Sequence, residues 1–269
     1  MIKSIIVPVD FSEAAGNALL FAAEISKRVS ASLIVIHVLP AGDSEAQAIQ
    51  KLELLVSELQ AAFGASLNYT SLVAHGNFVD TLTEQISAQR VDLIVMGTKG
   101  ASGLKRILIG SNTVKVLTHT KTPVMVIPEV ARFEDFNRKG KNRVVFATDL
   151  EEVENEASLE ILAEVVGLMI SPTLRVLNVR PKNTRLGFSQ EMERAALVSR
   201  FREDIETERI TVFDDSVMDG INFYLDKHID TGIVAMIARD SGGLFQRHFT
   251  HEMAAVTHYP LLVLNSSKD

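Results

Sequence analysis

The residues whose types and spacing could do chemistry lie in the first half of the chain. Gly97-Thr98-Lys99-Gly100 is followed, after nine further residues, by Gly110-Ser111. The apolar run 93–96 precedes this segment and indicates a buried strand, and the amphipathic segment 112–117 follows it and indicates a helix. A strand, a glycine turn and a helix start present backbone N–H groups and the positive end of a helix dipole to an anion.

The charge and the backbone freedom of this segment favour a polyphosphate ligand. Gly97 and Gly100 allow a sharp turn and let a ligand approach the backbone closely. Lys99, Lys105 and Arg106 contribute positive charge, and the segment contains no acidic residue. We therefore predict that it binds phosphate groups.

The composition is that of an ordinary globular protein. The chain has 269 residues, of which 46% are hydrophobic and 23% charged, enough for one large domain or two ordinary ones. The net charge of −7 argues against wholesale binding of nucleic acid, and the lack of cysteine excludes disulfides and thiolate metal sites. The N-terminal apolar run is too short for a secretion signal, and no run reaches the ~18 residues of a membrane span. We expect a cytoplasmic protein without a membrane partner.

The chain repeats one pattern in each half. Four apolar segments of the first half recur in the same order in the second half. The matching pairs are 3–10 and 142–149, 33–40 and 174–181, 93–96 and 233–236, and 123–127 and 260–264. We therefore predict two domains, residues 1–130 and 141–269, joined by the polar linker 129–141.

Within each half, short β-branched runs alternate with segments of helical periodicity, which is typical of βαβ units in a parallel sheet. In the first half we expect strands near 3–9, 33–39, 67–74, 92–97 and 123–128, and helices near 13–29, 44–63, 78–89 and 111–119. In the second half we expect strands near 143–148, 173–179, 208–213, 232–238 and 261–265. Ser12 and Ser44 are the expected N-caps. Met192, Leu197 and Phe201 are expected to form the core side of a helix in the second half.

Three segments of the first half together resemble the universal stress protein family. They are the opening Ile5-Ile-Val-Pro-Val-Asp10, the run Val35-Ile-His-Val38, and the pattern Met96-Gly-x2-Gly-x9-Gly-Ser. The whole chain resembles the tandem form of the family. The resemblance implies two tandem flavodoxin-like or Rossmann-like α/β domains, each a five-stranded parallel sheet flanked by helices, with strands one and four as central neighbours. Ligands of such sheets bind where the winding reverses, which would bring Asp10 and the glycine segment together.

Members of this family that carry the glycine motif bind ATP, and the resemblance assigns roles to the matching residues of this chain. Asp10 would accept hydrogen bonds from the ribose hydroxyls, and the backbone of Val38 would meet adenine. Ser111 and Thr113 would offer hydroxyls to the phosphates, with Mg²⁺ or Mn²⁺ between the phosphate groups. The expected nucleotide-binding residues are Pro8, Val9, Asp10, Val38, Met96, Gly97, Lys99, Gly100, Gly110, Ser111, Asn112 and Thr113. The resemblance assigns no catalytic side chain and no side chain that binds a metal.

The second half departs from this pattern. Asp149 keeps the carboxylate after the first strand, but Ile237 and Asp240 stand where the first half has Gly97 and Gly100. The negative charge of Asp240 opposes a phosphate group. We therefore predict that the second domain has lost the nucleotide site and that Asp149 is a helix cap or a structural acceptor.

Three functions stay open at this point. The first is an ATP-holding stress-response module whose nucleotide state regulates its conformation or its association. The second is a slow ATP hydrolase or an adenylyl-transferring enzyme on the same fold, although no residue offers an obvious base for an attacking water. The third is a structural or interaction protein that binds no nucleotide. We favour the first and expect at most weak ATPase activity.

The histidines offer one alternative chemistry. His248, His251, Glu252 and His258 form a metal-like cluster, but the chain has no His-Glu-x2-His motif. Solvated or capping histidines are therefore expected in place of a zinc site. His37 lies within the second strand and is expected to be a hydrogen-bonded structural histidine.

The last strand of each half predicts an assembly. The segments 123–127 and 260–264 would each end a domain as an apolar edge strand, and such edges favour pairing. The resembled family associates through these final strands. We therefore expect the two domains to pair within the chain, with a homodimer as the alternative.

Overall fold

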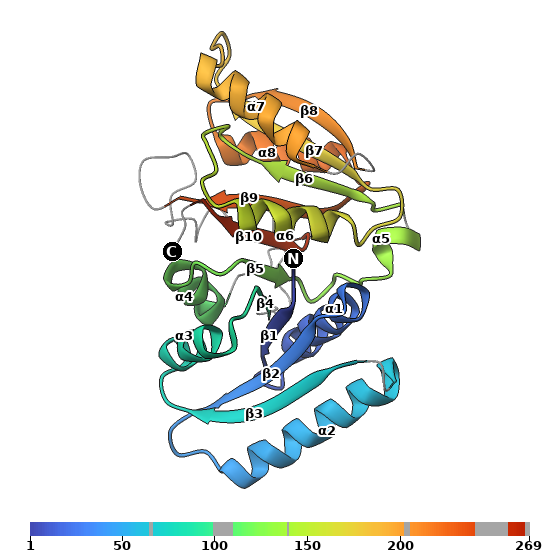
Figure 1. The fold of residues 1–269 in the computed structure, drawn as a ribbon, viewed down its shortest axis with the longest axis vertical. Coiled ribbons are helices and arrows are strands. Elements are labelled where there is room, and N and C mark those ends of the chain that lie inside the picture. Colours follow the sequence, from blue (N-terminus) through green and yellow to red (C-terminus); the bar gives the residue numbers. More distant parts are fainter. Residues whose placement is uncertain (65–66, 99–109, 139, 202–204, 240–257, 267–269) are drawn as a thin grey trace. The chain divides into compact units, whose positions relative to one another are not determined.

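The computed structural model contains two compact units, Met1–Phe133 and Glu134–Asp269. It describes all residues except 65–66, 99–109, 139, 202–204, 240–257 and 267–269. Each unit is a sheet with helices packed against it (Figure 1).

The first unit alternates strands and helices along the chain. Its strands are β1 (Ser4–Pro8), β2 (Ser32–Leu39), β3 (Tyr69–His75), β4 (Leu93–Gly97) and β5 (Val124–Ile127). Its helices are α1 (Glu13–Val29), α2 (Glu45–Phe63), α3 (Phe78–Gln89) and α4 (Ser111–His119). The expected elements of the first half are therefore confirmed, with small differences at their ends.

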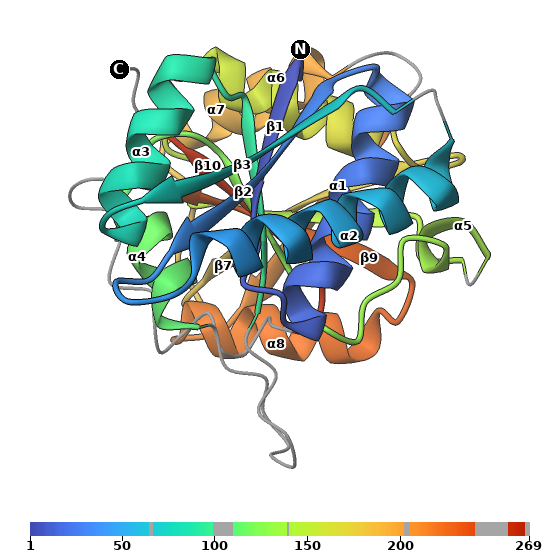
Figure 2. The same ribbon diagram turned by 90° about the horizontal axis from the view of Figure 1, so that it is seen from below.

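The sheet of the first unit has the strand order β3-β2-β1-β4-β5, and every neighbouring pair is parallel. The winding reverses between β1 and β4, because β2 and β3 lie on one side of this pair and β5 on the other. Helices α1 and α2 pack together on one face of the sheet, and α3 and α4 pack together on the other (Figure 2). The expected flavodoxin-like arrangement is confirmed.

Helix α1 shows why these residues form a helix at this place. Ser12 Oγ accepts a hydrogen bond from the backbone nitrogen of Ala15 at 3.3 Å, and Ser30 ends the helix in the left-handed conformation. Ser44 caps α2 in the same way, so both expected N-caps are confirmed. The side of α1 that packs on the sheet is rich in alanine, which lets the helix lie close to the strands. Its buried apolar residues are Ala14, Ala15, Ala18, Leu19, Phe21, Ala22, Ala23 and Ile25.

Gly97 marks the closest approach of α1 to β4. A Cβ atom at this position would lie 2.4 Å from the carbonyl oxygen of Ala14, which belongs to the helix backbone. Because protein interiors are close-packed, a side chain at this position would force the helix away from the strand. The packing of α1 on β4 therefore requires this glycine, in addition to the turn that the sequence predicts.

The second unit repeats the plan. Its strands are β6 (Arg143–Ala147), β7 (Thr173–Arg180), β8 (Glu206–Phe213), β9 (Thr231–Ala238) and β10 (Leu261–Asn265). Its helices are α5 (Asp135–Arg138), α6 (Glu156–Val166), α7 (Phe188–Arg200) and α8 (Val217–Lys227). The strand order is β10-β9-β6-β7-β8, all parallel, so β6 and β9 correspond to β1 and β4.

The register of the central strands relates the two units residue by residue. Ile5 of β1 pairs with Leu93 of β4, and Val144 of β6 pairs with Ile233 of β9. These pairs are the ones that the internal repeat aligns. The expected fold of two tandem five-stranded α/β domains is therefore confirmed.

The segment 129–141 is more structured than the prediction of a polar linker allows. It contains α5 and two buried aromatic residues, Phe133 and Phe136. The ring of Phe133 lies edge-on to Phe21 of α1, with 5.6 Å between ring centroids, and Arg28 lies over it at 4.8 Å. The boundary between the two units falls inside this segment, after Phe133. The segment is nevertheless anchored, because single aromatic residues pack without forming an apolar repeat that the sequence would show.

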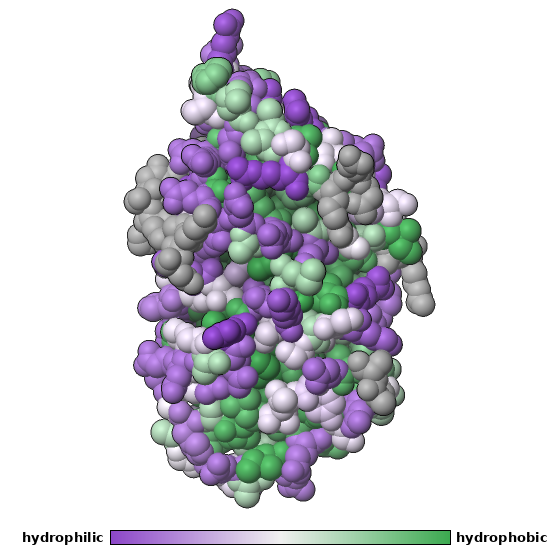
Figure 3. Space-filling model, viewed as in Figure 1, coloured by the Kyte–Doolittle hydropathy of each residue, from purple (hydrophilic) through white to green (hydrophobic). Residues whose placement is uncertain are grey.

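Helix α7 turns a different side to the core than expected. Leu197 and Phe201 are buried as predicted, but Met192 is exposed, as is Phe188 at the start of the helix. Glu193 is buried in place of Met192, and burial raises the pKa of its carboxyl group. Figure 3 shows hydrophobic residues scattered among hydrophilic ones on the face in view. No helix in the described part of the chain is long and apolar enough to cross a membrane.

Candidate functional site

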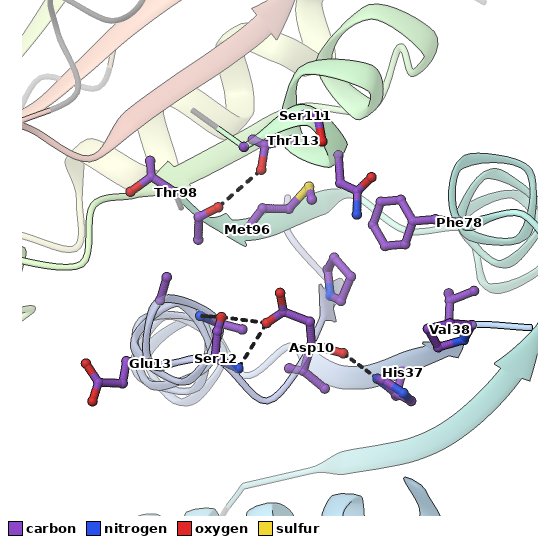
Figure 4. Close-up of a pocket in the computed structure, with 18 of the residues that line it drawn as sticks. Asp10, Ser12, Glu13, His37, Val38, Phe78, Met96, Thr98, Ser111 and Thr113 are labelled. Carbon is purple, nitrogen blue, oxygen red and sulfur yellow. Dashed lines mark hydrogen bonds between the residues drawn. The ribbon is translucent and has the colours of Figure 1, made fainter. Parts of the chain in front are cut away.

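A pocket of about 790 Å³ opens at the carboxyl ends of β1, β2 and β4 in the first unit (Figure 4). It lies where the winding of the sheet reverses, which is the usual ligand position in such sheets. The expected residues that line it are Pro8, Val9, Asp10, Val38, Met96, Gly97, Gly110, Ser111, Asn112 and Thr113. Lys99 and Gly100, the other two, lie outside the described residues. The fold therefore brings the described part of the predicted set into one pocket.

Asp10 is held at the end of β1 by a turn that aims its carboxylate at the pocket (Figure 4). Phe11 adopts the left-handed conformation, with φ 63°, between the strand and the helix. Asp10 Oδ1 accepts hydrogen bonds from the backbone nitrogen of Ser12 at 3.0 Å and from Ser12 Oγ. Among the described residues no ion pair neutralises this exposed carboxylate. It is therefore free to accept hydrogen bonds from a ligand.

His37 supports the same turn from the neighbouring strand β2. Its Nδ1 lies 2.7 Å from the carbonyl oxygen of Val9, and since a carbonyl only accepts, Nδ1 carries the hydrogen. The ring of His37 also contacts the ring of Phe11, with 4.5 Å between centroids. The expectation of a structural histidine is confirmed, and its contacts hold the turn that carries Asp10.

Helix α4 begins at the pocket without a side-chain cap. Its N-cap is Gly110, no side chain of the residues that the structure describes accepts a hydrogen bond at this end, and the first turn has no acidic residue. Helices α1, α2 and α3 are capped by the side chains of Ser12, Ser44 and Asn77. An uncapped first turn leaves N–H groups without partners, and together with the helix dipole it attracts an anion.

One hydrogen bond ties the start of α4 to the end of β4. Thr113 Oγ1 donates to the carbonyl oxygen of Gly97 at 3.1 Å. The hydrogen of this hydroxyl is therefore used by the backbone, whereas Ser111 is exposed at the helix end. Of the two hydroxyls expected near the phosphates, Ser111 is the one left to donate.

The pocket has an apolar wall that the sequence analysis missed. Phe78 is the first residue of α3, and its ring points into the pocket (Figure 4). Leu39 and Pro40 also line the pocket, beside Val38. The strand order was the signal that could have found Phe78, because the loop after β3 ends at the same edge as the loops after β1 and β2. The other lining residues outside the predicted set are Ser12, Glu13, Ala14, Ala15, His37, Gly76, Asn77, Thr98 and Glu129.

The corresponding edge of the second unit is built differently. The register of β6 and β9 places Asp149 at the position of Asp10, and Leu150 repeats the left-handed turn of Phe11 with φ 60°. Asp149 is buried, and its carboxylate accepts two hydrogen bonds from Arg239 at 2.9 and 3.0 Å. The expectation that Asp149 is a structural acceptor is confirmed.

Metal ligands do not gather in the described part of the chain. No group of three or more His, Cys, Asp or Glu side chains there could hold a metal ion. His248, His251 and Glu252, from the cluster noted in the sequence, lie outside the described residues, as does Asp240.

The fold is shared with solved structures over nearly the whole chain. A universal stress protein from Archaeoglobus fulgidus matches with a TM-score of 0.73 at 18% identity, covering 98% of each chain. A structure from Pseudomonas aeruginosa matches with a TM-score of 0.64 at 16% identity, covering 98% of this chain and 93% of that one. Such identities show the fold, and they define the chain as a doubly wound α/β protein over both halves.

The family follows from the sequence. Residues 1–128 match the sequence model of the universal stress protein family. A universal stress protein of Methanocaldococcus jannaschii is 31% identical over 144 residues, which cover 46% of this chain and 81% of that protein. The chain belongs to the universal stress protein family, and it has the tandem form, since the structural matches span both halves.

Proposed function

We propose that the first unit binds ATP and that the chain acts as a nucleotide-dependent regulatory module in the stress response. The observation that carries the proposal is that the uncapped start of α4 and the exposed carboxylate of Asp10 line one pocket. A helix N-terminus attracts phosphate groups, and a carboxylate accepts hydrogen bonds from sugar hydroxyls. A nucleoside phosphate carries both groups on one molecule.

The phosphate groups would lie at the start of α4. The backbone N–H groups of residues 111–113 and the hydroxyl of Ser111 are the donors there, and Gly110 leaves the backbone accessible. The family resemblance adds Lys99 and Gly100 to this end of the site. A Mg²⁺ or Mn²⁺ ion would be held chiefly by the phosphates themselves, since these ions bind oxygen ligands and keep several waters.

The base would lie against the apolar wall of the pocket. Val38 and Met96 line this part of the site from two strands, and the ring of Phe78 faces it from α3. A flat heteroaromatic base gains by contact with an aromatic side chain. This wall favours adenosine over a bare sugar phosphate.

We assign no catalytic role to the residues of the pocket. Phosphoryl transfer requires an aligned nucleophile and a clamp on the developing charge. In this proposal Asp10 faces the sugar, and His37 donates to the backbone of Val9. The first unit is thus proposed to hold the nucleotide, and the second unit is proposed to lack a nucleotide site.

Mass spectrometry of the small molecules that the purified full-length protein releases on denaturation tests the proposal. We expect ATP or ADP, and a higher melting temperature when Mg-ATP is added to the emptied protein. A protein that releases no adenine nucleotide and shows no thermal shift would contradict it. Steady release of phosphate or AMP over many turnovers would instead identify a hydrolase or an adenylyl-transferring enzyme.

Replacing Phe78 with alanine tests the base end of the site. Loss of one base-stacking side chain costs about 1–3 kcal/mol, so the affinity for ATP should fall roughly tenfold or more. The affinity for inorganic triphosphate, which has no base, should stay unchanged. Phe78→Tyr keeps the ring and serves as the matched control. Unchanged ATP affinity in Phe78→Ala would show that the base binds elsewhere.

A further inference from the structure

Arg239 lies directly after β9 in the second unit and is almost fully buried, with 7% of its surface exposed. Its guanidinium donates to both carboxylate oxygens of Asp149, at 2.9 and 3.0 Å. It also donates to the carbonyl oxygens of Glu151 and Glu152, at 2.7 and 2.9 Å. One buried cation is therefore held by a carboxylate and by two backbone carbonyls, which are strong acceptors for its fixed fork of donors.

One of the two ionic partners, Asp149, occupies the position that Asp10 holds in the pocket of the first unit. The register of the central strands aligns Asp149 with Asp10, and in the internal repeat of the sequence Arg239 stands at the position of Lys99. In both units the residue after this aspartate adopts the left-handed conformation, Phe11 in the first unit and Leu150 in the second. The same backbone thus presents a carboxylate to an open pocket in the first unit and to an arginine in the second.

The loop that supplies the carbonyl groups of Glu151 and Glu152 is longer than its counterpart in the first unit, because α6 begins farther from its strand than α1 does. Helix α1 begins at Glu13, three residues after Asp10, whereas α6 begins at Glu156, seven residues after Asp149. The position of Gly97, where a Cβ atom would strike α1, is taken in the second unit by the buried Ile237.

A helix backbone as close to β9 as α1 is to β4 would collide with an isoleucine side chain at that position. The chain therefore runs as a loop through residues 150–155 before α6 begins. Carbonyl groups in a loop have no helical N–H partners and need other donors. The guanidinium of Arg239 supplies these donors to Glu151 and Glu152.

We infer that Arg239 serves the second unit as a built-in ligand. It binds the carboxylate of Asp149, whose counterpart Asp10 faces the pocket of the first unit. It also binds the loop 150–155, which stands where the first unit has the first turn of α1. The second unit is thereby complete without a diffusible ligand, and its folding depends on this internal cation. The inference stands on the geometry of the second unit and holds whichever ligand the first unit binds.

Thermal unfolding of full-length Arg239→Met, measured without nucleotide, tests the inference. Methionine keeps much of the side-chain volume but leaves Asp149 as a buried charge without its partner, which is strongly destabilising. We expect the unfolding temperature of the second unit to fall by about 10 °C. Hydrogen exchange of a peptide spanning 149–155 should become faster, since the loop loses its donors.

Three further variants make the test specific. The double variant Asp149→Asn with Arg239→Met removes both charges and should recover part of the loss. Asp10→Asn changes the equivalent, exposed carboxylate and should leave the unfolding temperature nearly unchanged. Arg239→Lys keeps the charge but lacks the planar guanidinium group, so its unfolding temperature should fall less than that of Arg239→Met. This variant can be measured if Arg239→Met does not fold.

Two results would overturn the inference. One is an unfolding temperature and an exchange rate in Arg239→Met that equal those of the unchanged protein. The other is calorimetric titration that finds a second ATP site in this variant. Arg239 would then block a nucleotide site in the second unit and would not replace its ligand. Because stability and exchange are measured without nucleotide, a failure of ATP binding would refute the proposed function and leave this inference intact.

Discussion

Replacing Gly97 with alanine is expected to destabilise the first unit and to weaken nucleotide binding together. The added Cβ atom would lie 2.4 Å from the carbonyl oxygen of Ala14, and this neighbour belongs to a helix backbone that cannot rotate away. Forcing an extra carbon into a packed core costs about 1–3 kcal/mol. Displacing α1 would also shift Ser12, which holds the carboxylate of Asp10. Calorimetric unfolding and ATP titration of the variant measure both effects.

Gly16→Ala is the matched control for this prediction. Gly16 lies in α1 itself, and a Cβ atom added there would meet nothing within 4 Å. Alanine in a helix interior is favoured over glycine by about 1 kcal/mol, so this variant should be slightly more stable than the unchanged protein. A Gly97→Ala variant that is as stable as Gly16→Ala would contradict the packing argument.

Replacing Asp10 with alanine is expected to separate binding from stability. The carboxylate is exposed and accepts its hydrogen bonds from the nearby Ser12, so the free energy of unfolding should change by less than about 1 kcal/mol. Hydrogen bonds to a charged group contribute about 1.5–3 kcal/mol each. Losing those to the ribose hydroxyls should weaken ATP binding on the order of 100-fold.

Asp149→Ala makes the same chemical change at the equivalent position of the second unit. Its buried partner Arg239 would lose the carboxylate that accepts two of its hydrogen bonds and would keep only the more distant carboxylate of Glu151 at 3.9 Å. Breaking a buried ion pair in this way typically costs about 3–5 kcal/mol. ATP affinity at the first unit should stay unchanged if this variant is folded. If the Asp10→Ala variant binds ATP with unchanged affinity, Asp10 does not contact the nucleotide.

Much of the fold is predictable because local signals and packing agree. The ends of α1 and α2 follow from Ser12 and Ser44, whose hydroxyls accept hydrogen bonds from the first turn. The central strands β1, β4, β6 and β9 follow from short apolar, largely β-branched runs that are buried on both faces in a parallel sheet. The internal repeat then aligns the second half with the first, and the register of β1 with β4 and of β6 with β9 agrees with that alignment.

The features that the sequence did not predict depend on contacts between distant segments. Phe78 carries no motif of its own, and only the order of the strands brings it to the pocket. Arg239 directly precedes Asp240, which was expected to repel phosphate. Its partner Asp149 is ninety residues away in the sequence, so no local pattern indicates the pair. Phe133 is one of two isolated aromatic residues in a polar segment, and its contact with Phe21 requires the folded helix.

Calorimetric titration of the full-length, nucleotide-free protein with Mg-ATP tests the central claim most directly. The first unit has an uncapped helix start and an exposed carboxylate in one pocket, whereas the second unit has paired its carboxylate with Arg239. We predict binding of one ATP per chain, which Asp10→Ala weakens strongly. No binding, or two equivalent sites per chain, would contradict the account.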